Sequence, residues 1–269
     1  MRTGKLLGRL GLVLCAFLFL GGAIDSAVAK TTDQSDLWWI PTESGWGIQF
    51  VQEEDTLFAT MFIYGPDGKP TWYVATLQYT NTLYWTGTLY ATTGPWFGTV
   101  PFDPTTVTVT EVGTMSLSAP LINKSTLTYT VNGVQVVKTI QRQTLVTLNL
   151  NGQYSGTLSQ TGTGLVCNAS VSNPATPVSV TMTQSGQAMT VTTQTGTDTC
   201  TFPGTFTQGG HFGRVAGAYT CASGDSGNFS IFEMAVSWYD FRARTFLTSN
   251  SGCTIKGYIN GLKQPPPLQ

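Results

Sequence analysis

Short runs of β-branched and aromatic residues, separated by turn sequences, fill this chain from about residue 37 to residue 263. Asn132-Gly133, between LTYTV and VQVVK, is the clearest of these turns. A two-residue hairpin needs positive φ at both positions, and this pair adopts it readily. About eight runs precede residue 145 and about nine follow it, and no stretch of ten residues after residue 29 shows helical periodicity. The pattern predicts an all-β protein with two small antiparallel β-barrel or β-sandwich domains in tandem.

The first 29 residues have the three parts of a secretory signal peptide. A basic start is followed by an apolar core from Leu10 to Gly21 and by the small residues Ser26 to Ala29. We therefore expect residues 1–29 to be removed on export and the mature protein to be periplasmic, cell-surface or extracellular. No later run is long enough for a transmembrane helix, so we expect no transmembrane segment.

We divide the remaining chain by composition. Residues 30–145 form an aromatic-rich β domain, residues 146–263 form a cysteine-bearing β domain, and residues 264–269 form a disordered, proline-rich tail. No Pro- or Gly-rich linker separates the two halves, so the boundary near residue 145 rests on the change in content alone.

The charge balance excludes one large class of partner. Three of the 13 basic and one of the 14 acidic residues lie in the predicted signal peptide, which leaves the mature chain slightly acidic. Nucleic-acid binding requires a basic surface, so we expect no nucleic-acid partner. Only 10% of the residues are charged, compared with roughly 25% in an ordinary soluble domain. Threonine, serine, glycine and glutamine supply the polar surface instead.

Four cysteines follow the signal peptide, all in the second half of the chain. An even number in an exported protein predicts two disulfides, here formed by Cys167, Cys200, Cys221 and Cys253. Three connectivities are possible. We favour Cys167 with Cys200 and Cys221 with Cys253, because consecutive strands of a meander would hold these pairs. There is no Cys-x-x-Cys spacing and only one histidine, so we expect no metal site and no cofactor.

Six of the seven tryptophans lie between Leu37 and Phe97. Rings at this density either pack a barrel core or line a binding cleft at a barrel mouth. We favour the core for most of them, but rings that lie in proline-containing loops are candidates for binding. The candidate ligand-binding residues in this window are Trp38, Trp39, Glu43, Trp46, Trp72, Tyr73, Trp96 and Phe97.

The same window contains a recognisable pattern in which ESGWG is followed by DGKPTWY and then by GTLYATTGPWFG. This pattern, over residues 37–143, resembles a β module that recurs in secreted bacterial proteins and has no established activity. The resemblance implies export and a β fold, and nothing about chemistry. Its motif residues here are Glu43, Ser44, Gly45, Trp46, Gly47, Gly68, Pro70, Trp72, Tyr73, Gly94, Pro95 and Phe97.

Two catalytic functions, a glycoside hydrolase and a serine protease, compete with turn formation as explanations of the acidic residues and of the GDSG segment. A glycoside hydrolase needs two carboxylates across a cleft, and Glu43 could act with one of Asp55, Asp67 or Asp103. Asp67 and Asp103 lie in turn sequences that already explain them. The segment from Gly224 to Gly227, GDSG, matches the nucleophile motif of chymotrypsin-like serine proteases. The only histidine, His211, precedes Ser226 by just 15 residues, so turn chemistry is the better explanation.

These observations favour a secreted, non-enzymatic binding module with no catalytic residues. It would hold a glycan, a small apolar ligand or a partner protein at an aromatic-lined barrel mouth. A carbohydrate-active hydrolase using Glu43 and a second carboxylate is the first alternative. An envelope or matrix component that assembles through exposed edge strands is the second.

Overall fold

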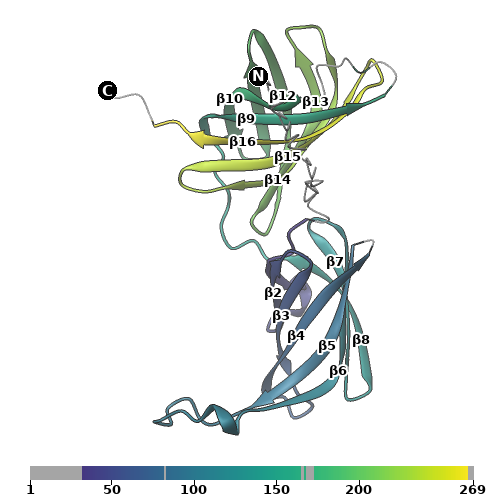
Figure 1. Ribbon diagram of the computed structural model, residues 1–269, viewed down its shortest axis with the longest axis vertical. Helices are drawn as coiled ribbons and strands as arrows, with labels where there is room; N and C mark the ends of the chain where they lie inside the picture. Colours follow the sequence, from purple (N-terminus) through teal and green to yellow (C-terminus); the bar gives the residue numbers. More distant parts are fainter. Residues whose placement is uncertain (1–31, 82, 165–166, 168–172, 266–269) are drawn as a thin grey trace, which may run out of the picture. The chain divides into compact units, whose positions relative to one another are not determined.

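A computed structural model describes residues 32–81, 83–164, 167 and 173–265. The described chain forms two closed antiparallel β-barrels of eight strands each (Figure 1). The all-β prediction is confirmed, and barrels rather than sandwiches are the form it takes. The predicted signal peptide and residues 266–269 of the predicted tail lie outside the described residues, so both stay predictions. Within the described ranges, no helix is long and apolar enough to cross a membrane.

The first barrel runs through eight strands in sequence order and closes by pairing of the first with the last, where Trp38 lies opposite Arg142. Two 3₁₀ turns, η1 and η2, lie in its connections. The elements are β1 (Asp36–Trp39), η1 (Pro41–Glu43), β2 (Gly47–Glu53), β3 (Thr56–Tyr64), β4 (Pro70–Asn81), β5 (Tyr84–Thr93), η2 (Pro104–Thr106), β6 (Thr108–Leu121), β7 (Lys124–Val131) and β8 (Val134–Arg142).

Alternation of side chains across the strands fills this barrel. In β3, Leu57, Ala59 and Met61 point inward and are fully buried, while Phe58 and Phe62 point outward. The core also contains the rings of Trp38 and Trp85, each with no exposed surface. Since side chains occupy the interior, the exposed rings of this barrel lie on its outside.

Strand β6 joins two runs that the sequence separates. The sequence itself predicts one strand from Val107 to Val112 and another from Met115 to Ala119, but Gly113 carries the chain through a bulge against β5. A Cβ at this position would lie 1.9 Å from the carbonyl oxygen of Thr130. Glycine is therefore required by close backbone approach, and the strand continues through it.

The second barrel has the same plan and closes by pairing of β16 with β9 (Figure 1). Its core is less rich in tryptophan and is built around rings such as Tyr154, Phe202, Tyr219 and Phe241. The predicted strand from Leu165 to Val171 lies, apart from Cys167, outside the described residues. The strands are β9 (Gly152–Thr163), β10 (Asn173–Ser185), β11 (Ala188–Thr195), β12 (Asp198–Gly209), β13 (Phe212–Cys221), β14 (Ser226–Val236), β15 (Asp240–Ser249) and β16 (Thr254–Lys263).

The favoured disulfide connectivity is wrong. Cys167 pairs with Cys253, and Cys200 pairs with Cys221. Cys200 and Cys221 are direct cross-strand partners in the β12–β13 pair. Cys167 follows β9 and Cys253 precedes β16, so the disulfide lies at the seam where the barrel closes. The favoured pairs suit a linear meander, whereas closure of the barrel makes β9 and β16 neighbours. Two disulfides indicate an oxidising, extracytoplasmic environment.

Candidate functional site

Trp38 belongs to the core of the first barrel, and the expectation that it lies in a binding loop is wrong. It lies in β1 with no exposed surface, and its Nε1 donates a hydrogen bond to the Gln34 carbonyl oxygen at 3.0 Å. Trp39, the next residue along the strand, is half-buried and points to the opposite face. Strand β1 is only four residues long, too short for its sequence pattern to distinguish it from a loop.

Arg142 helps to hold Trp38 in place. Its guanidinium carbon lies 4.6 Å from the centre of a Trp38 ring, and its side chain has no exposed surface. Carbonyl oxygens of Asp33, Ser35 and Ile122 accept hydrogen bonds from the guanidinium, and the Asp36 carboxylate lies 3.2 Å away. Burial lowers the pKa of Arg142, and the Asp36 charge opposes this shift. A buried charge so well paired is a structural feature.

Glu43, Trp46 and Lys138 form a polar cluster at the η1 end of the barrel. One carboxylate oxygen of Glu43, Oε2, accepts hydrogen bonds from Lys138 Nζ at 2.6 Å and from Trp46 Nε1 at 3.0 Å. The Lys138 bond lowers the pKa of Glu43, with Trp46 adding to the effect. The Lys138 ammonium also lies 5.7 Å from the centre of a Trp46 ring. The cluster is accessible to solvent, and its carboxylate stays ionised at neutral pH.

Four exposed rings lie along the outer surface of β3 and β4, and we call them the outer aromatic face. Phe62 is directly opposite Trp72 in the strand pairing, and Tyr64 is opposite Pro70. Trp72 is 51% exposed and Tyr64 is 57% exposed. Tyr73, the neighbour of Trp72, is half-buried and packs against the barrel core instead. The four members of the face are Phe58, Phe62, Tyr64 and Trp72.

The two glycines of the ESGWG pattern lie beneath this face. A Cβ on Gly47 would lie 2.8 Å from Cζ of Phe62, and a Cβ on Gly45 would lie 3.4 Å from the Tyr64 hydroxyl. Gly45 also has a φ of 114°, which favours glycine. The pattern therefore has a structural explanation. Its glycines make room for rings of the neighbouring strand, while Trp46, between them, packs against the barrel core.

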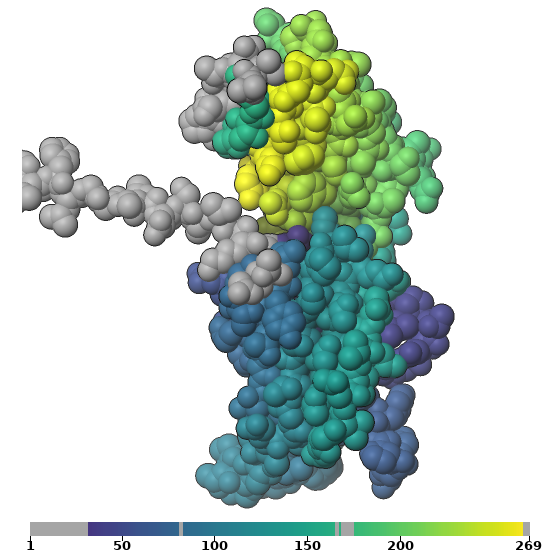
Figure 2. Space-filling model, turned by 90° about the vertical axis from the view of Figure 1, so that its right-hand side faces the viewer, coloured from purple at the N-terminus to yellow at the C-terminus, as the bar shows by residue number. Residues whose placement is uncertain are grey.

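Trp96 and Phe97 are on a separate part of the molecule. The chain between β5 and β6, which we call the β5–β6 arm, extends away from the barrel wall (Figures 1 and 2). Trp96 is 69% exposed and Phe97 is 88% exposed, and their ring centres are 5.3 Å apart. Asp103 begins η2 on this arm and accepts hydrogen bonds from Thr105.

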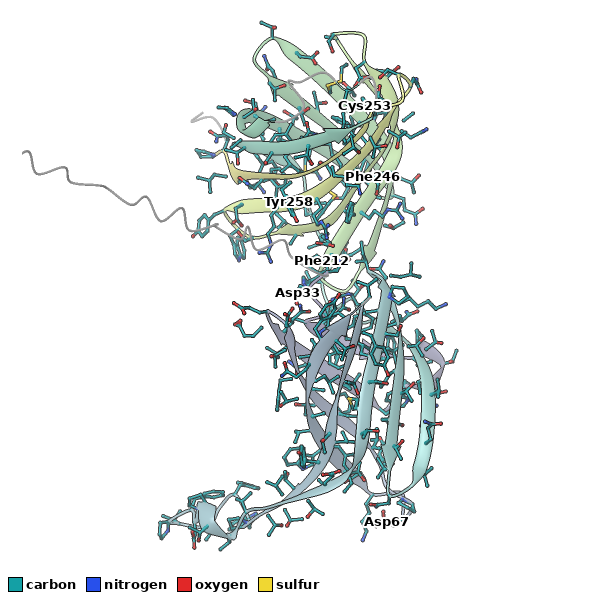
Figure 3. All side chains as sticks on the ribbon, turned by 45° about the vertical axis from the view of Figure 1, so that its right-hand side comes forward. Asp33, Asp67, Phe212, Phe246, Cys253 and Tyr258 are labelled. Atoms are coloured by element: carbon teal, nitrogen blue, oxygen red, sulfur yellow. A yellow bond between two sulfur atoms is a disulfide. The ribbon has the colours of Figure 1, made fainter. Side chains whose placement is uncertain are left out.

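The acidic residues proposed as partners of Glu43 are distributed over different turns. Asp67 lies in the β3–β4 turn beside Lys69, as Figure 3 shows at one end of the barrel. Asp103 caps η2 on the β5–β6 arm. Asp55 comes immediately before β3, and Tyr64 is at the other end of that strand. Asp67 and Asp103 each accept hydrogen bonds within their own turns, and the hydrolase hypothesis gains no support from these positions.

The second barrel supplies residues that the sequence analysis did not select as a site. Asp198, Asp225 and Tyr219 line a cavity at the end of the barrel where both disulfides lie. Asp198 also lies close to the sulfurs of Cys200 and Cys221. Those sulfurs form a disulfide and are not thiolates, so this group is not a metal site. Both aspartates fall in turn-like sequences, TGTDT and GDSG, which is why neither was selected.

We compared the chain with known proteins by sequence family and by structure. No protein-family model, curated protein or solved structure matches it. The resemblance of residues 37–143 to a secreted bacterial β module therefore remains a prediction.

Proposed function

We propose that this protein is an exported, non-catalytic binding protein whose first barrel binds a neutral glycan chain at the outer aromatic face. Residues 1–29 would direct export, and the two disulfides of the second barrel would form after it. The binding site would lie on the outer wall of the barrel and not at its mouth, where the sequence suggested it, because side chains fill the interior.

The observation that carries this proposal is a group of large, exposed rings on an uncharged surface. Solvent-exposed rings in such density are unusual for a soluble protein and commonly mark a binding surface. Strands β3 and β4 contain no Asp, Glu, Lys or Arg between Thr56 and Tyr64 or between Pro70 and Asn81. An apolar, uncharged surface fits the C–H faces of neutral sugar rings better than it fits an acidic or basic ligand.

Glu43, which is near Gly45 in the sequence, would add a polar contact to a bound chain. Gly45 lies beneath Tyr64, and Glu43 precedes it by two residues. A carboxylate has several lone pairs, so Glu43 can accept a sugar hydroxyl in addition to its bonds from Lys138 and Trp46. The lowered pKa of Glu43 suits a hydrogen-bond acceptor and is the opposite of what a general acid requires.

Two other roles are less well supported by this geometry. Assembly through edge strands needs a free edge, and among the described strands both barrels close on themselves. A partner protein could cover the outer aromatic face. Protein interfaces usually have a polar rim, but β3 and β4 contain no charged residues that could form one.

The test is binding of the mature protein to insoluble cellulose and chitin and to soluble xyloglucan, mannan and β-1,3-glucan. We expect saturable binding to at least one of these without release of reducing sugar. Trp72→Ala should weaken binding at least about fivefold, which is typical of losing a central aromatic contact. Trp238→Ala removes an equally large ring, 91% exposed, from the second barrel and should leave binding unchanged. No binding to any polysaccharide would refute the proposal.

A further inference from the structure

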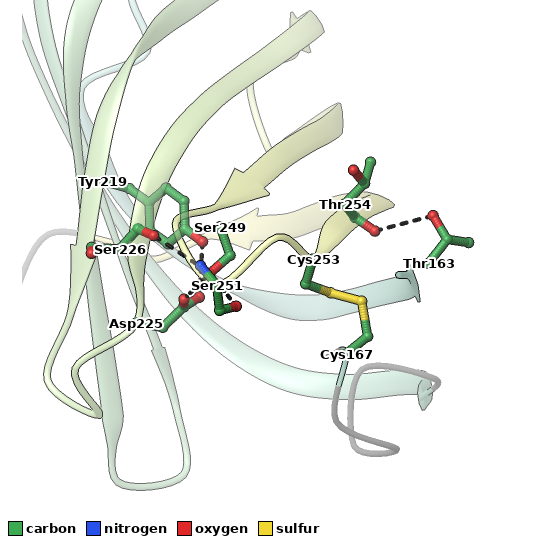
Figure 4. Close-up of a disulfide and its surroundings, with 9 residues drawn as sticks. All are labelled: Thr163, Cys167, Tyr219, Asp225, Ser226, Ser249, Ser251, Cys253 and Thr254. Atoms are coloured by element: carbon green, nitrogen blue, oxygen red, sulfur yellow. Dashed lines mark hydrogen bonds between the residues drawn. A yellow bond between two sulfur atoms is a disulfide. The ribbon is translucent and has the colours of Figure 1, made fainter. Parts of the chain in front are cut away.

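A cavity of about 490 Å³ lies within the second barrel, at the end where the disulfides are. Strands from around the barrel contribute to its wall, and Figure 4 shows the side nearest Cys167 and Cys253. This volume is in the range of small-molecule sites, which are usually preformed and contain a few convergent polar groups. The site is separate from the outer aromatic face of the first barrel.

The charge of the lining is entirely acidic. Asp198 and Asp225 are the only charged residues among the described side chains that line the cavity; no Lys, Arg or His is among them. No ion pair is recorded for either carboxylate within the described part of the chain. Two carboxyl groups that share a small cavity without a counter-ion favour a cationic occupant.

Both carboxylates are held in place by neutral donors. Asp225 accepts hydrogen bonds from the Tyr219 hydroxyl at 2.8 Å and from the Ser249 hydroxyl at 2.5 Å. These groups converge in Figure 4. Asp198 accepts from the backbone N–H and the hydroxyl of Ser223, each at 2.9 Å. Burial and the bond to Asp225 raise the pKa of Tyr219 to about 12, so this phenol is a neutral donor at physiological pH.

One wall of the cavity is aromatic. Phe202 and Tyr219 both line it, and their rings stack with centres 5.4 Å apart and an interplanar angle of 23°. Aromatic faces attract organic cations, most strongly where water is displaced. The Cys200–Cys221 disulfide joins the two strands that carry these rings, so this wall of the cavity is preorganised for binding.

Thr193 provides an independent sign that the cavity is built for a polar ligand. Its side chain lines the cavity and is only 7% exposed, yet its hydroxyl makes no hydrogen bond to any described residue. The hydroxyl faces the cavity and is not sealed off from water, so it is free to bond to whatever fills the cavity. A ligand with a hydrogen-bonding group, or the water that precedes it, would supply the partner.

We propose that this cavity binds a small organic cation, with its ammonium group between the Asp198 and Asp225 carboxylates and its apolar part against Phe202 and Tyr219. Thr193 would hydrogen-bond to a hydroxyl or amine of the same molecule. This ligand class is distinct from the neutral glycan assigned to the first barrel, and each assignment can fail without the other.

The test uses the mature, disulfide-bonded protein and matched pairs of charged and uncharged probes. Choline is compared with 3,3-dimethylbutan-1-ol, and tyramine with 4-ethylphenol, by isothermal titration calorimetry. We expect at least one cation to bind and its neutral counterpart to bind at least about tenfold more weakly. Asp225→Asn should reduce the affinity for that cation at least about tenfold. Asp67→Asn, in the first barrel, should not change it.

Thr193→Val tests the cavity with a variant that should still fold, because it removes a hydroxyl that makes no hydrogen bond to a described residue. Its melting temperature should be unchanged or higher, while affinity for the cation falls about threefold or more. The proposal is overturned if neutral and charged probes bind equally, or if neither cation binds at about 10 mM, well above ordinary affinities. It is also overturned if calcium chloride displaces the bound cation and itself requires Asp225, because the site would then be a metal site.

Discussion

Removal of each disulfide separately should destabilise the second barrel by different amounts. The cysteines of the first bridge are 86 residues apart and those of the second are 21 apart. In the chain-entropy relation, loops of these lengths stabilise by about 4.6 and about 3.3 kcal/mol. The Cys167→Ala/Cys253→Ala double variant should therefore be about 1 kcal/mol less stable than Cys200→Ala/Cys221→Ala.

Urea unfolding of the two double variants measures this difference. The first barrel contains no cysteine among β1 to β8, so its transition serves as an internal reference and should not move. Thiol titration checks the pairing itself. Both double variants should contain no free thiol, whereas Cys167→Ala/Cys200→Ala should leave two, because each replacement breaks a different bridge. Absence of free thiols in that last variant, or a smaller loss from the 86-residue bridge, would refute the reasoning.

Three further changes test the first barrel. Trp38→Ala empties a fully buried site and should cost about 3 to 5 kcal/mol in urea unfolding, whereas a loss below about 1 kcal/mol would place the ring at the surface. Gly47→Ala places a methyl group against Phe62 and 3.1 Å from the Trp38 carbonyl oxygen, so it should lower the melting temperature and, by displacing the Phe62 ring, weaken polysaccharide binding; unchanged binding would show that the ring does not take part. The pKa of Glu43 is lowered in the folded state from its ordinary 4.5, so its stabilising contribution is present above about that pH and is lost as pH falls through the folded-state pKa. Glu43→Gln should flatten the acid limb of stability measured against pH, and an identical profile would contradict the ion pair with Lys138.

Local signals made most of the fold predictable. The Asn132-Gly133 hairpin and the strands on either side of it follow from turn chemistry and β propensity, and β8 has the predicted bounds of Val134 and Arg142. Closure of the sheets did not follow, because pairing of β1 with β8 and of β9 with β16 joins strands far apart in sequence. The wrong disulfide pairing has the same origin.

The candidate sites were predictable only in part. Trp72 was selected by its place in an aromatic window, but that window could not distinguish the inward Trp38 from the outward rings of β3. Strand alternation decides this, and it requires the correct register. Asp225 was passed over because GDSG is also good turn chemistry. Asp225 and Asp198 line one cavity only because the folded barrel brings their two turns to the same end.

Mapping of oxidised tryptophans by mass spectrometry, with and without a bound oligosaccharide, tests the central claim most directly. In the free protein, N-bromosuccinimide should oxidise the exposed Trp72 and Trp238 and spare the buried Trp38 and Trp85. When a glycan found in the binding assay is present, Trp72 should be protected while Trp238 is still oxidised. Equal oxidation of Trp72 in the free and glycan-saturated protein would contradict the account, because the glycan would then bind away from the outer aromatic face.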